Sequence, residues 1–206
     1  MEKTLIQLLE KAKKFHLLGK ISEAQKIYLS LIKKNKNNGQ LYFLLGTSFL
    51  QNKKYDLAIK NLDISIKLNP KVSDSYNNMG IALAEIGDYE NAIKNYDETL
   101  NLNINHADAY VNKAIALKNL KLFEQSQKCF ESAIRSNDKN FKAYNGLGNL
   151  YKELKKLPLS LENYNLALKI NPNYSDALSN KGEVLYELKQ YELAIDNFIK
   201  AFSLKP

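Results

Sequence analysis

The chain has 206 residues, a formal net charge of +8 and a hydrophobic fraction of 45%, which is enough for a buried core. No stretch reaches the roughly 18 consecutive apolar residues of a membrane span, and the N-terminal residues lack the apolar run of a signal peptide. Because Cys129 is the single cysteine, the sequence excludes an internal disulfide framework and a cysteine-rich zinc site, and it favours a reducing, cytoplasmic setting.

The positive charge is carried almost entirely by lysine, since Arg135 is the only arginine. Arginine makes the bidentate contacts to phosphate and guanine on which specific nucleic-acid recognition depends, so its scarcity argues against a nucleic-acid partner. Lysines also recur at 34-residue spacing, either as a solvated outer face or as a stripe for phosphate, and we favour the solvated face. This column consists of Lys26, Lys60, Lys94 and Lys128.

Taken in chain order, the sequence repeats itself every 34 residues. The stretch that begins at Tyr42 recurs at Tyr76, Tyr110, Tyr144 and Leu178, and Leu8 extends the series towards the N-terminus. Six units therefore tile the chain, beginning at residues 5, 39, 73, 107, 141 and 175. A constant period of this length is typical of a solenoid built from identical supersecondary units.

Each unit is predicted to form two helices. In the first helix the eighth position of the unit is always small, as expected where two helices cross closely: Ala12, Gly46, Gly80, Ala114, Gly148 and Gly182. Gly19 and Gly87 suit a left-handed stop after the first helix. The second helix is predicted to begin at residues that suit a helix N-terminus: Ser22, Asp56, Glu90, Glu124, Pro158 and Glu192. Pro70, Pro172 and Pro206 end three of the units.

This pattern resembles the tetratricopeptide repeat over essentially the whole chain, through Tyr76, Met79, Gly80, Leu83 and their counterparts in the other units, together with Ala92, Tyr96 and Pro70. The resemblance implies an all-α fold, a right-handed superhelical solenoid of six stacked helix-turn-helix units that forms a single array over residues 1–206. It also implies a groove lined by the first helices, which in this family typically holds peptides. Stacking would stabilise the array, because one helix pair cannot cover its own apolar face.

The sequence offers no constellation for catalysis. His16 and His106 fall at different positions of their units, and every glycine lies at a packing or turn position rather than in a phosphate-binding loop. Cys129 is expected to be a buried structural thiol rather than a reactive one. We therefore expect no enzymatic activity, no cofactor and no metal site.

Asparagine is frequent at the sixth position of the unit, which the resemblance assigns to the groove. Asn78, Asn112 and Asn180 occupy it in three units, while Glu10, Leu44 and Gly146 occupy it in the others. The row resembles the asparagine ladder of the O-linked N-acetylglucosamine transferase repeats, and a carboxamide can pair with a peptide group of any sequence. Asn77, Asn145 and Asn149 extend the predicted ladder; the alternative is that asparagine is simply abundant in this chain.

The remaining groove positions divide along the chain. The middle units supply an apolar stretch, predicted to anchor a ligand: Phe43, Leu44, Ile81, Val111 and Ile115. The last two units supply acidic side chains, predicted to lie near basic residues of the ligand: Glu153, Glu183 and Glu187. A clamp for a C-terminal carboxylate is not expected, because only Lys142 is basic among the second-position residues.

Two functions from different classes remain open. The first is a scaffold that binds an extended peptide or a partner helix in its groove. The second is the substrate-recruiting arm of a larger transferase whose catalytic domain would follow residue 206. The sequence also predicts that the apolar face around Leu193, Phe198 and Phe202 is covered, by a second copy, a groove occupant or further sequence.

Overall fold

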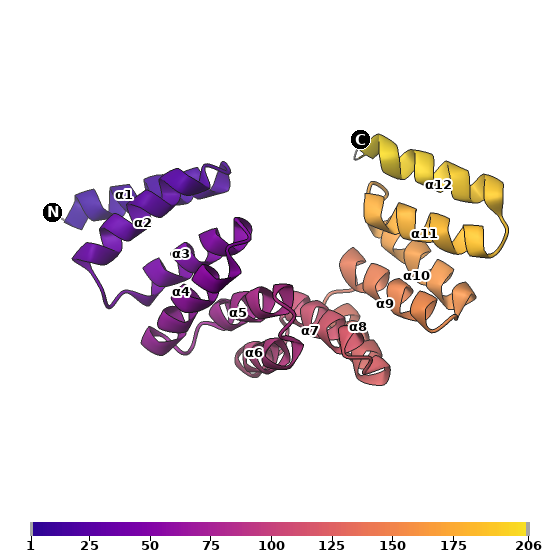
Figure 1. Cartoon of the computed structure of the whole chain (residues 1–206), viewed down its shortest axis with the longest axis horizontal. Helices are drawn as coiled ribbons and strands as arrows, with labels where there is room; N and C mark the ends of the chain where they lie inside the picture. Colours follow the sequence, from indigo (N-terminus) through magenta and orange to yellow (C-terminus); the bar gives the residue numbers. More distant parts are fainter. Residues whose placement is uncertain (1, 205–206) are drawn as a thin grey trace. The chain divides into compact units, whose positions relative to one another are not determined.

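The computed structural model describes residues 2–204, with side chains from residue 6 onward, and these residues form α-helices joined by short turns (Figure 1). Contacts divide the chain into two units, residues 1–104 and 105–206. The first unit holds α1 Glu2–Leu17, α2 Ile21–Lys34, α3 Gly39–Gln51, α4 Tyr55–Leu68, α5 Ser73–Glu85 and α6 Tyr89–Leu102. The second unit holds α7 Ala107–Asn119, α8 Phe123–Ser136, α9 Phe141–Glu153, α10 Leu157–Ile170, α11 Ser175–Glu187 and α12 Tyr191–Leu204.

Consecutive helices pack as pairs within each unit, and the second helix of a pair also packs on the first helix of the next pair in the same unit, as α2 does on α3 and α8 does on α9. The predicted all-α fold of stacked helix pairs is therefore confirmed. Five first helices begin at the residue where the 34-residue period places them, whereas α1 begins at Glu2. Second helices begin one residue earlier than predicted. At α6 the carboxylate of Asp88 caps this earlier start by accepting a hydrogen bond from the backbone of Asn91, whereas α2, α4, α8 and α10 begin without a side-chain cap.

The turn inside each helix pair contains one residue with a left-handed backbone. Gly19 and Gly87 have φ values of +73° and +85°, so this prediction is confirmed. The sequence did not reveal that lysine adopts the same conformation in the other four turns, at φ values between 56° and 62°: Lys53, Lys121, Lys155 and Lys189. A left-handed lysine costs about 1–2 kcal/mol relative to the right-handed conformation, so these four turns are strained.

The small residue at the eighth position has the packing role that the sequence predicted. A Cβ atom on Gly80 would lie 2.6 Å from the ring of Tyr96, and one on Gly148 would lie 2.6 Å from the ring of Tyr164. Both tyrosine rings are almost fully buried against the first helix of their own pair. Burial in this apolar setting raises the pKa of Tyr164 to about 12.

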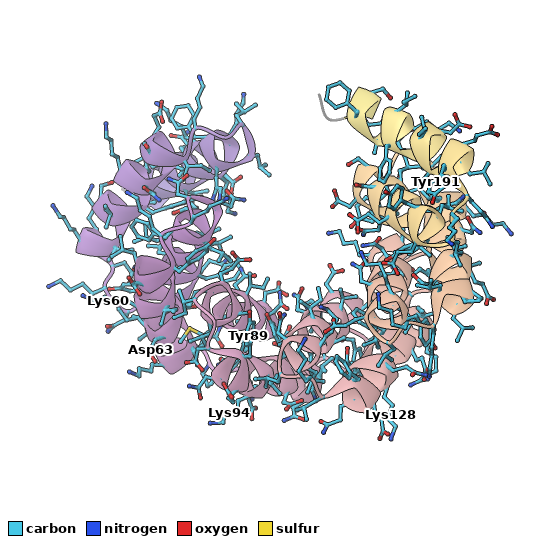
Figure 2. The ribbon with its side chains drawn as sticks, turned by 45° about the vertical axis from the view of Figure 1, so that its right-hand side comes forward. Lys60, Asp63, Tyr89, Lys94, Lys128 and Tyr191 are labelled. Atoms are coloured by element: carbon cyan, nitrogen blue, oxygen red, sulfur yellow. The ribbon has the colours of Figure 1, made fainter. Side chains whose placement is uncertain are left out.

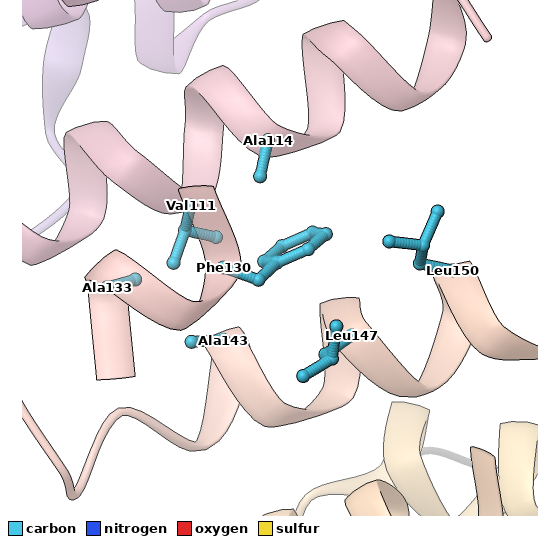
Figure 3. Close-up of a cluster of buried hydrophobic side chains, with 7 residues drawn as sticks. All are labelled: Val111, Ala114, Phe130, Ala133, Ala143, Leu147 and Leu150. Atoms are coloured by element: carbon cyan, nitrogen blue, oxygen red, sulfur yellow. The ribbon is translucent and has the colours of Figure 1, made fainter. Parts of the chain in front are cut away.

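The pair α7/α8 packs differently because Ala114 takes the place of glycine. Phe130 of α8 lies between α7 and α9, in a buried cluster with Val111, Ala114, Leu147 and Leu150 (Figure 3). A Cβ atom on Gly146 of α9 would lie 2.2 Å from its ring, which is closer than real Cβ contacts allow. The ring therefore packs on its own helix pair and on the next one at the same time.

The lysines of the second helices lie on the solvated side of their units. Lys60, Lys94 and Lys128 project into solvent, away from the first helix of their pair (Figure 2). Lys67 forms a 2.7 Å ion pair with Asp63 one turn away on α4. Among the described residues, no helix is long and apolar enough to cross a membrane.

Candidate peptide-binding face

The first helices of the second unit form a polar face. α9 contacts both α7 and α11, so these three helices present neighbouring surfaces. A hollow of about 510 Å³ opens on this face. It is lined by Lys118, Asn149, Lys152, Glu153, Lys155, Asn180 and Glu187. Four of the predicted groove residues, Asn149, Asn180, Glu153 and Glu187, therefore line one hollow.

Two hydrogen bonds made by asparagines on this face connect neighbouring helices. The side-chain amide of Asn180 on α11 donates a 3.1 Å hydrogen bond to Oδ1 of Asn145 on α9. Oδ1 of Asn149 accepts a 2.6 Å hydrogen bond from the hydroxyl of Tyr164 on α10. Asn145 is buried, at 7% exposure, whereas Asn149 and Asn180 are half-buried at the wall of the hollow.

Each predicted acidic groove residue is paired with a lysine from the preceding helix pair. Glu153 contacts the ammonium groups of Lys118 and Lys121. Glu183 lies 2.6 Å from Nζ of Lys152, and Glu187 lies 3.2 Å from Nζ of Lys155. These pairs were missed at the level of sequence, although their spacings of 31, 32 and 35 residues are close to the repeat length.

The two lysines that contact Glu153 change its acidity. The hydrogen bond from Lys121 is the largest influence on its pKa, which lies below the ordinary value of 4.5 despite partial burial. The Glu153 side chain is 30% exposed, compared with 51% for Glu183 and 37% for Glu187. Glu153 is thus the most enclosed of the three carboxylates, and Glu183 is the most accessible.

The first helices of the first unit present a less charged surface. Asn78 on α5 donates a 3.0 Å hydrogen bond to the hydroxyl of Thr47 on α3. Nε2 of His16 on α1 lies 2.8 Å from Oε1 of Gln51, and Nδ1 of the same ring lies 3.3 Å from the hydroxyl of Tyr28. A hollow of about 430 Å³ is lined by Lys13, His16, Leu17, Tyr28, Leu44, Thr47 and Gln51. Of the predicted apolar anchors, Leu44 lies in this wall, while Phe43 and Ile81 are half-buried.

Two further predicted groove residues, Val111 and Asn77, are buried. Val111 differs from the expectation: it is only 5% exposed and packs in the core around Phe130, between α7 and α9. Asn77 is 8% exposed. Asn112 is half-buried on α7, and Ile115, four residues from Val111, is 43% exposed.

The packing explains one interruption of the asparagine row, the one at Gly146. Asn78, Asn112 and Asn180 each follow a 34-residue repeat whose eighth position is glycine, namely Gly46, Gly80 and Gly148. Leu44 and Gly146 instead follow units that carry alanine, at Ala12 and Ala114. At Gly146 the reason is direct, since the ring of Phe130 occupies the space of any side chain there. At Gly146 the interruption is therefore a packing requirement.

The two histidines and the cysteine have structural surroundings. His106 caps the N-terminus of α7, where Nδ1 accepts a 3.2 Å hydrogen bond from the backbone of Ala109. Cys129 is half-buried beside the Phe130 cluster. In the part of the chain that the structure describes, no group of three or more His, Cys, Asp or Glu side chains could hold a metal ion.

These features define an all-α protein of stacked helix pairs, and sequence comparison identifies the family. Family profiles for the tetratricopeptide repeat match residues 18–72, 43–110, 107–140, 141–174 and 163–196. The matches together run from residue 18 to residue 196, so the chain belongs to the tetratricopeptide repeat (TPR) family. A search of curated proteins found no match.

Solved structures show the same fold. The Cut9–Hcn1 hetero-tetramer of the APC/C aligns with a TM-score of 0.86 at 18% identity, over 98% of this chain and 40% of that chain. PilF of Pseudomonas aeruginosa aligns with a TM-score of 0.82 at 14% identity, over 100% and 93% of the two chains. YrrB, a TPR protein with an unusual peptide-binding site, aligns with a TM-score of 0.61 at 17% identity, over 87% and 92%. At these identities the likeness concerns the fold.

Proposed function

We propose that this chain is a protein-interaction scaffold and that the first-helix face of its second unit binds an extended polypeptide. The observation that carries the proposal is the hollow of about 510 Å³ in which Asn149 and Asn180 lie among lysine and glutamate side chains. Such a surface offers hydrogen-bond donors and acceptors without a deep apolar pocket, as expected for a site that pairs with backbone groups. The peptide-binding site of YrrB, a protein of the same fold, supports this function by analogy.

The asparagines retain hydrogen-bonding capacity beyond their contacts within the protein. Asn180 uses an N–H for Asn145, which leaves its carbonyl oxygen and second N–H for a ligand. Asn149 uses its oxygen for Tyr164, which leaves its amino group. Because these contacts hold the carboxamides in place, little side-chain entropy is lost on binding. Each hydrogen bond to a peptide group contributes about 0.5–1.5 kcal/mol.

The charged side chains divide into a structural and a recognition set. Glu153 is enclosed by two lysines, so we assign it to holding α7 and α9 together. Glu183 and Glu187 each have one lysine partner and greater exposure, so they can share their carboxylates with a basic residue of the ligand. In the first unit, the hollow beside Leu44 is proposed to take an apolar anchor, with Asn78 as its polar neighbour. A binding role for Asn112 stays a prediction. The arrangement of all six 34-residue units as one array also stays a prediction.

The proposal is tested by the binding of a peptide library to matched variants. N149A/N180A should weaken unrelated peptides by similar amounts, about 1–3 kcal/mol in total, because it removes backbone contacts. N165A is the control, since Asn165 is an exposed asparagine on α10 outside the hollow. Thermal unfolding of each variant separates lost binding from lost folding. Unchanged binding by N149A/N180A, or an equal loss in N165A, would contradict the proposed site.

Charge reversal tests the recognition set separately. E183K should change which peptides bind and how binding depends on salt, because Glu183 contributes to selection between ligands. E162K is the control, since Glu162 is exposed on α10, whereas Glu183 pairs with Lys152 in the wall of the hollow. If N149A/N180A reshapes the sequence preference while E183K leaves it unchanged, the two roles have been assigned wrongly.

A further inference from the structure

Two positions of the 34-residue repeat meet across neighbouring first helices. At the twelfth and ninth positions of successive repeats, Nζ of Lys152 on α9 lies 2.6 Å from a carboxylate oxygen of Glu183 on α11. One repeat earlier the same two positions hold Lys118 on α7 and Asn149 on α9, and both of these residues line the hollow of about 510 Å³. The protein therefore combines an ammonium group with a carboxamide at the place where the next repeat has an ion pair.

Lys118 shares the carboxylate that it contacts with a second lysine. Its Nζ lies 3.3 Å from Oε2 of Glu153, while Nζ of Lys121 lies 2.5 Å from Oε1 of the same side chain. Two ammonium groups thus face one carboxylate, and this cluster keeps one positive charge. Water solvates much of Lys121, which is 68% exposed, whereas the side chain of Lys118 is only 25% exposed at the wall of the hollow. The hollow is therefore where this positive charge can be neutralised.

Asn149 adds hydrogen-bond donors to the same wall. Its Oδ1 accepts the 2.6 Å hydrogen bond from the hydroxyl of Tyr164, which leaves its amino group for the hollow. That amino group has two N–H donors, so one can serve a carboxylate while the other serves a backbone carbonyl. An ammonium group together with an amide N–H is a suitable set of partners for a carboxylate, because both are donors and one carries the opposite charge.

We propose that Lys118 and Asn149 form a subsite for the carboxylate of an aspartate or glutamate side chain in the bound polypeptide. The ligand carboxylate takes the part that Glu183 takes beside Lys152 in the next repeat. Its single negative charge matches the one positive charge that the cluster around Glu153 retains. This subsite, which rests on the proposed peptide binding to the same face, specifies the chemistry of that ligand.

The subsite also sets the spacing of charges along the ligand. Lys118 lies on α7 and Glu183 lies on α11, and α9 contacts both of these helices. With about 8–10 Å between neighbouring helices, the two side chains are roughly 16–20 Å apart. An extended chain covers that distance in about five or six residues. The preferred ligand therefore carries its acidic residue about five or six positions from the basic residue that lies near Glu183.

A library of synthetic decapeptides with blocked termini tests the subsite, with glutamate or glutamine placed at each position in turn. The full chain should bind the glutamate form about tenfold more tightly at one position. K118Q should lose this preference, and so should N149E, because its own carboxylate then pairs with Lys118. K128Q and N165E are matched controls that make the same changes in net charge at exposed residues outside the hollow, and both should keep the preference.

The measured quantity is the ratio of two affinities for one protein, so a variant that folds less well changes both affinities equally. Peptides that bind without a preference for glutamate, or a preference that K118Q retains, would overturn the subsite and leave the scaffold proposal intact. A glutamine-only series with a free C-terminus should not gain affinity; an equal gain there, lost in K118Q, would assign the subsite to chain ends and overturn a side-chain ligand. A parent that binds no peptide would overturn both proposals.

Discussion

Replacing Gly146 with alanine should destabilise the second unit, although glycine is a poor residue inside a helix. The added Cβ atom would lie 2.2, 2.5 and 3.1 Å from three ring atoms of Phe130. That ring is fully buried, with Leu147 and Leu150 beside it, so it cannot turn away. Overpacking of this kind costs up to about 3 kcal/mol, and the better helix propensity of alanine returns about 1 kcal/mol. We expect a net loss of about 2 kcal/mol.

Thermal and urea unfolding monitored by circular dichroism measure this loss. For a chain of this length, about 2 kcal/mol corresponds to a fall in the unfolding midpoint of about 4–8 °C. The effect should disappear in an F130L background, where the ring is absent, so the two substitutions should be strongly non-additive. A G146A variant as stable as the parent, or equal costs in both backgrounds, would refute the assigned contact.

Two further variants examine the turns and the ion pairs. K189G should raise the free energy of unfolding in urea by roughly 0.5–1 kcal/mol, because glycine adopts the left-handed backbone without strain and no ion pair is broken. K121G should raise it by less, since Lys121 also pairs with Glu153. E153Q should lower stability at pH 7 by about 0.2–1 kcal/mol. Because the pKa of Glu153 is lowered by folding, the difference should be present above pH 4.5 and vanish as the pH falls through the folded pKa; a difference that persists at the lowest pH would contradict the pairing.

The sequence predicted where the helices begin, to within one residue in every pair except at α1, because the same boundary pattern recurs in each 34-residue repeat. A single small residue such as Gly80 would have been weak evidence, but its recurrence at one position of every unit indicated a close helix crossing, which the structure confirms at Tyr96. The left-handed turns were predicted only where glycine marks them. Lys189 and its three counterparts adopt the same backbone, and lysine carries no signal for that conformation.

The candidate site was harder to predict, because neighbouring units decide which groove residue reaches solvent. Val111 and Ile115 lie one turn apart on α7, yet the first is buried and the second exposed. Their difference depends on where Phe130 places its ring, which a period of 34 residues does not specify. Likewise, Glu153 is acidic in sequence but enclosed by lysines in space. An acidic residue on a groove face therefore indicates ligand charge only after its partners within the protein are known.

The packing of the Phe130 ring against Gly146 of α9 has a consequence for local unfolding of the second unit. Local unfolding of α9 and α10 would uncover Phe130 and empty the core of the pair before it, so the two pairs should lose protection from hydrogen exchange together. Pairs whose ring rests on their own glycine, such as α5/α6, keep that contact when a neighbour opens. The 34-residue segments are thus not interchangeable cassettes: moving residues 107–140 elsewhere would require a glycine in the segment that follows them.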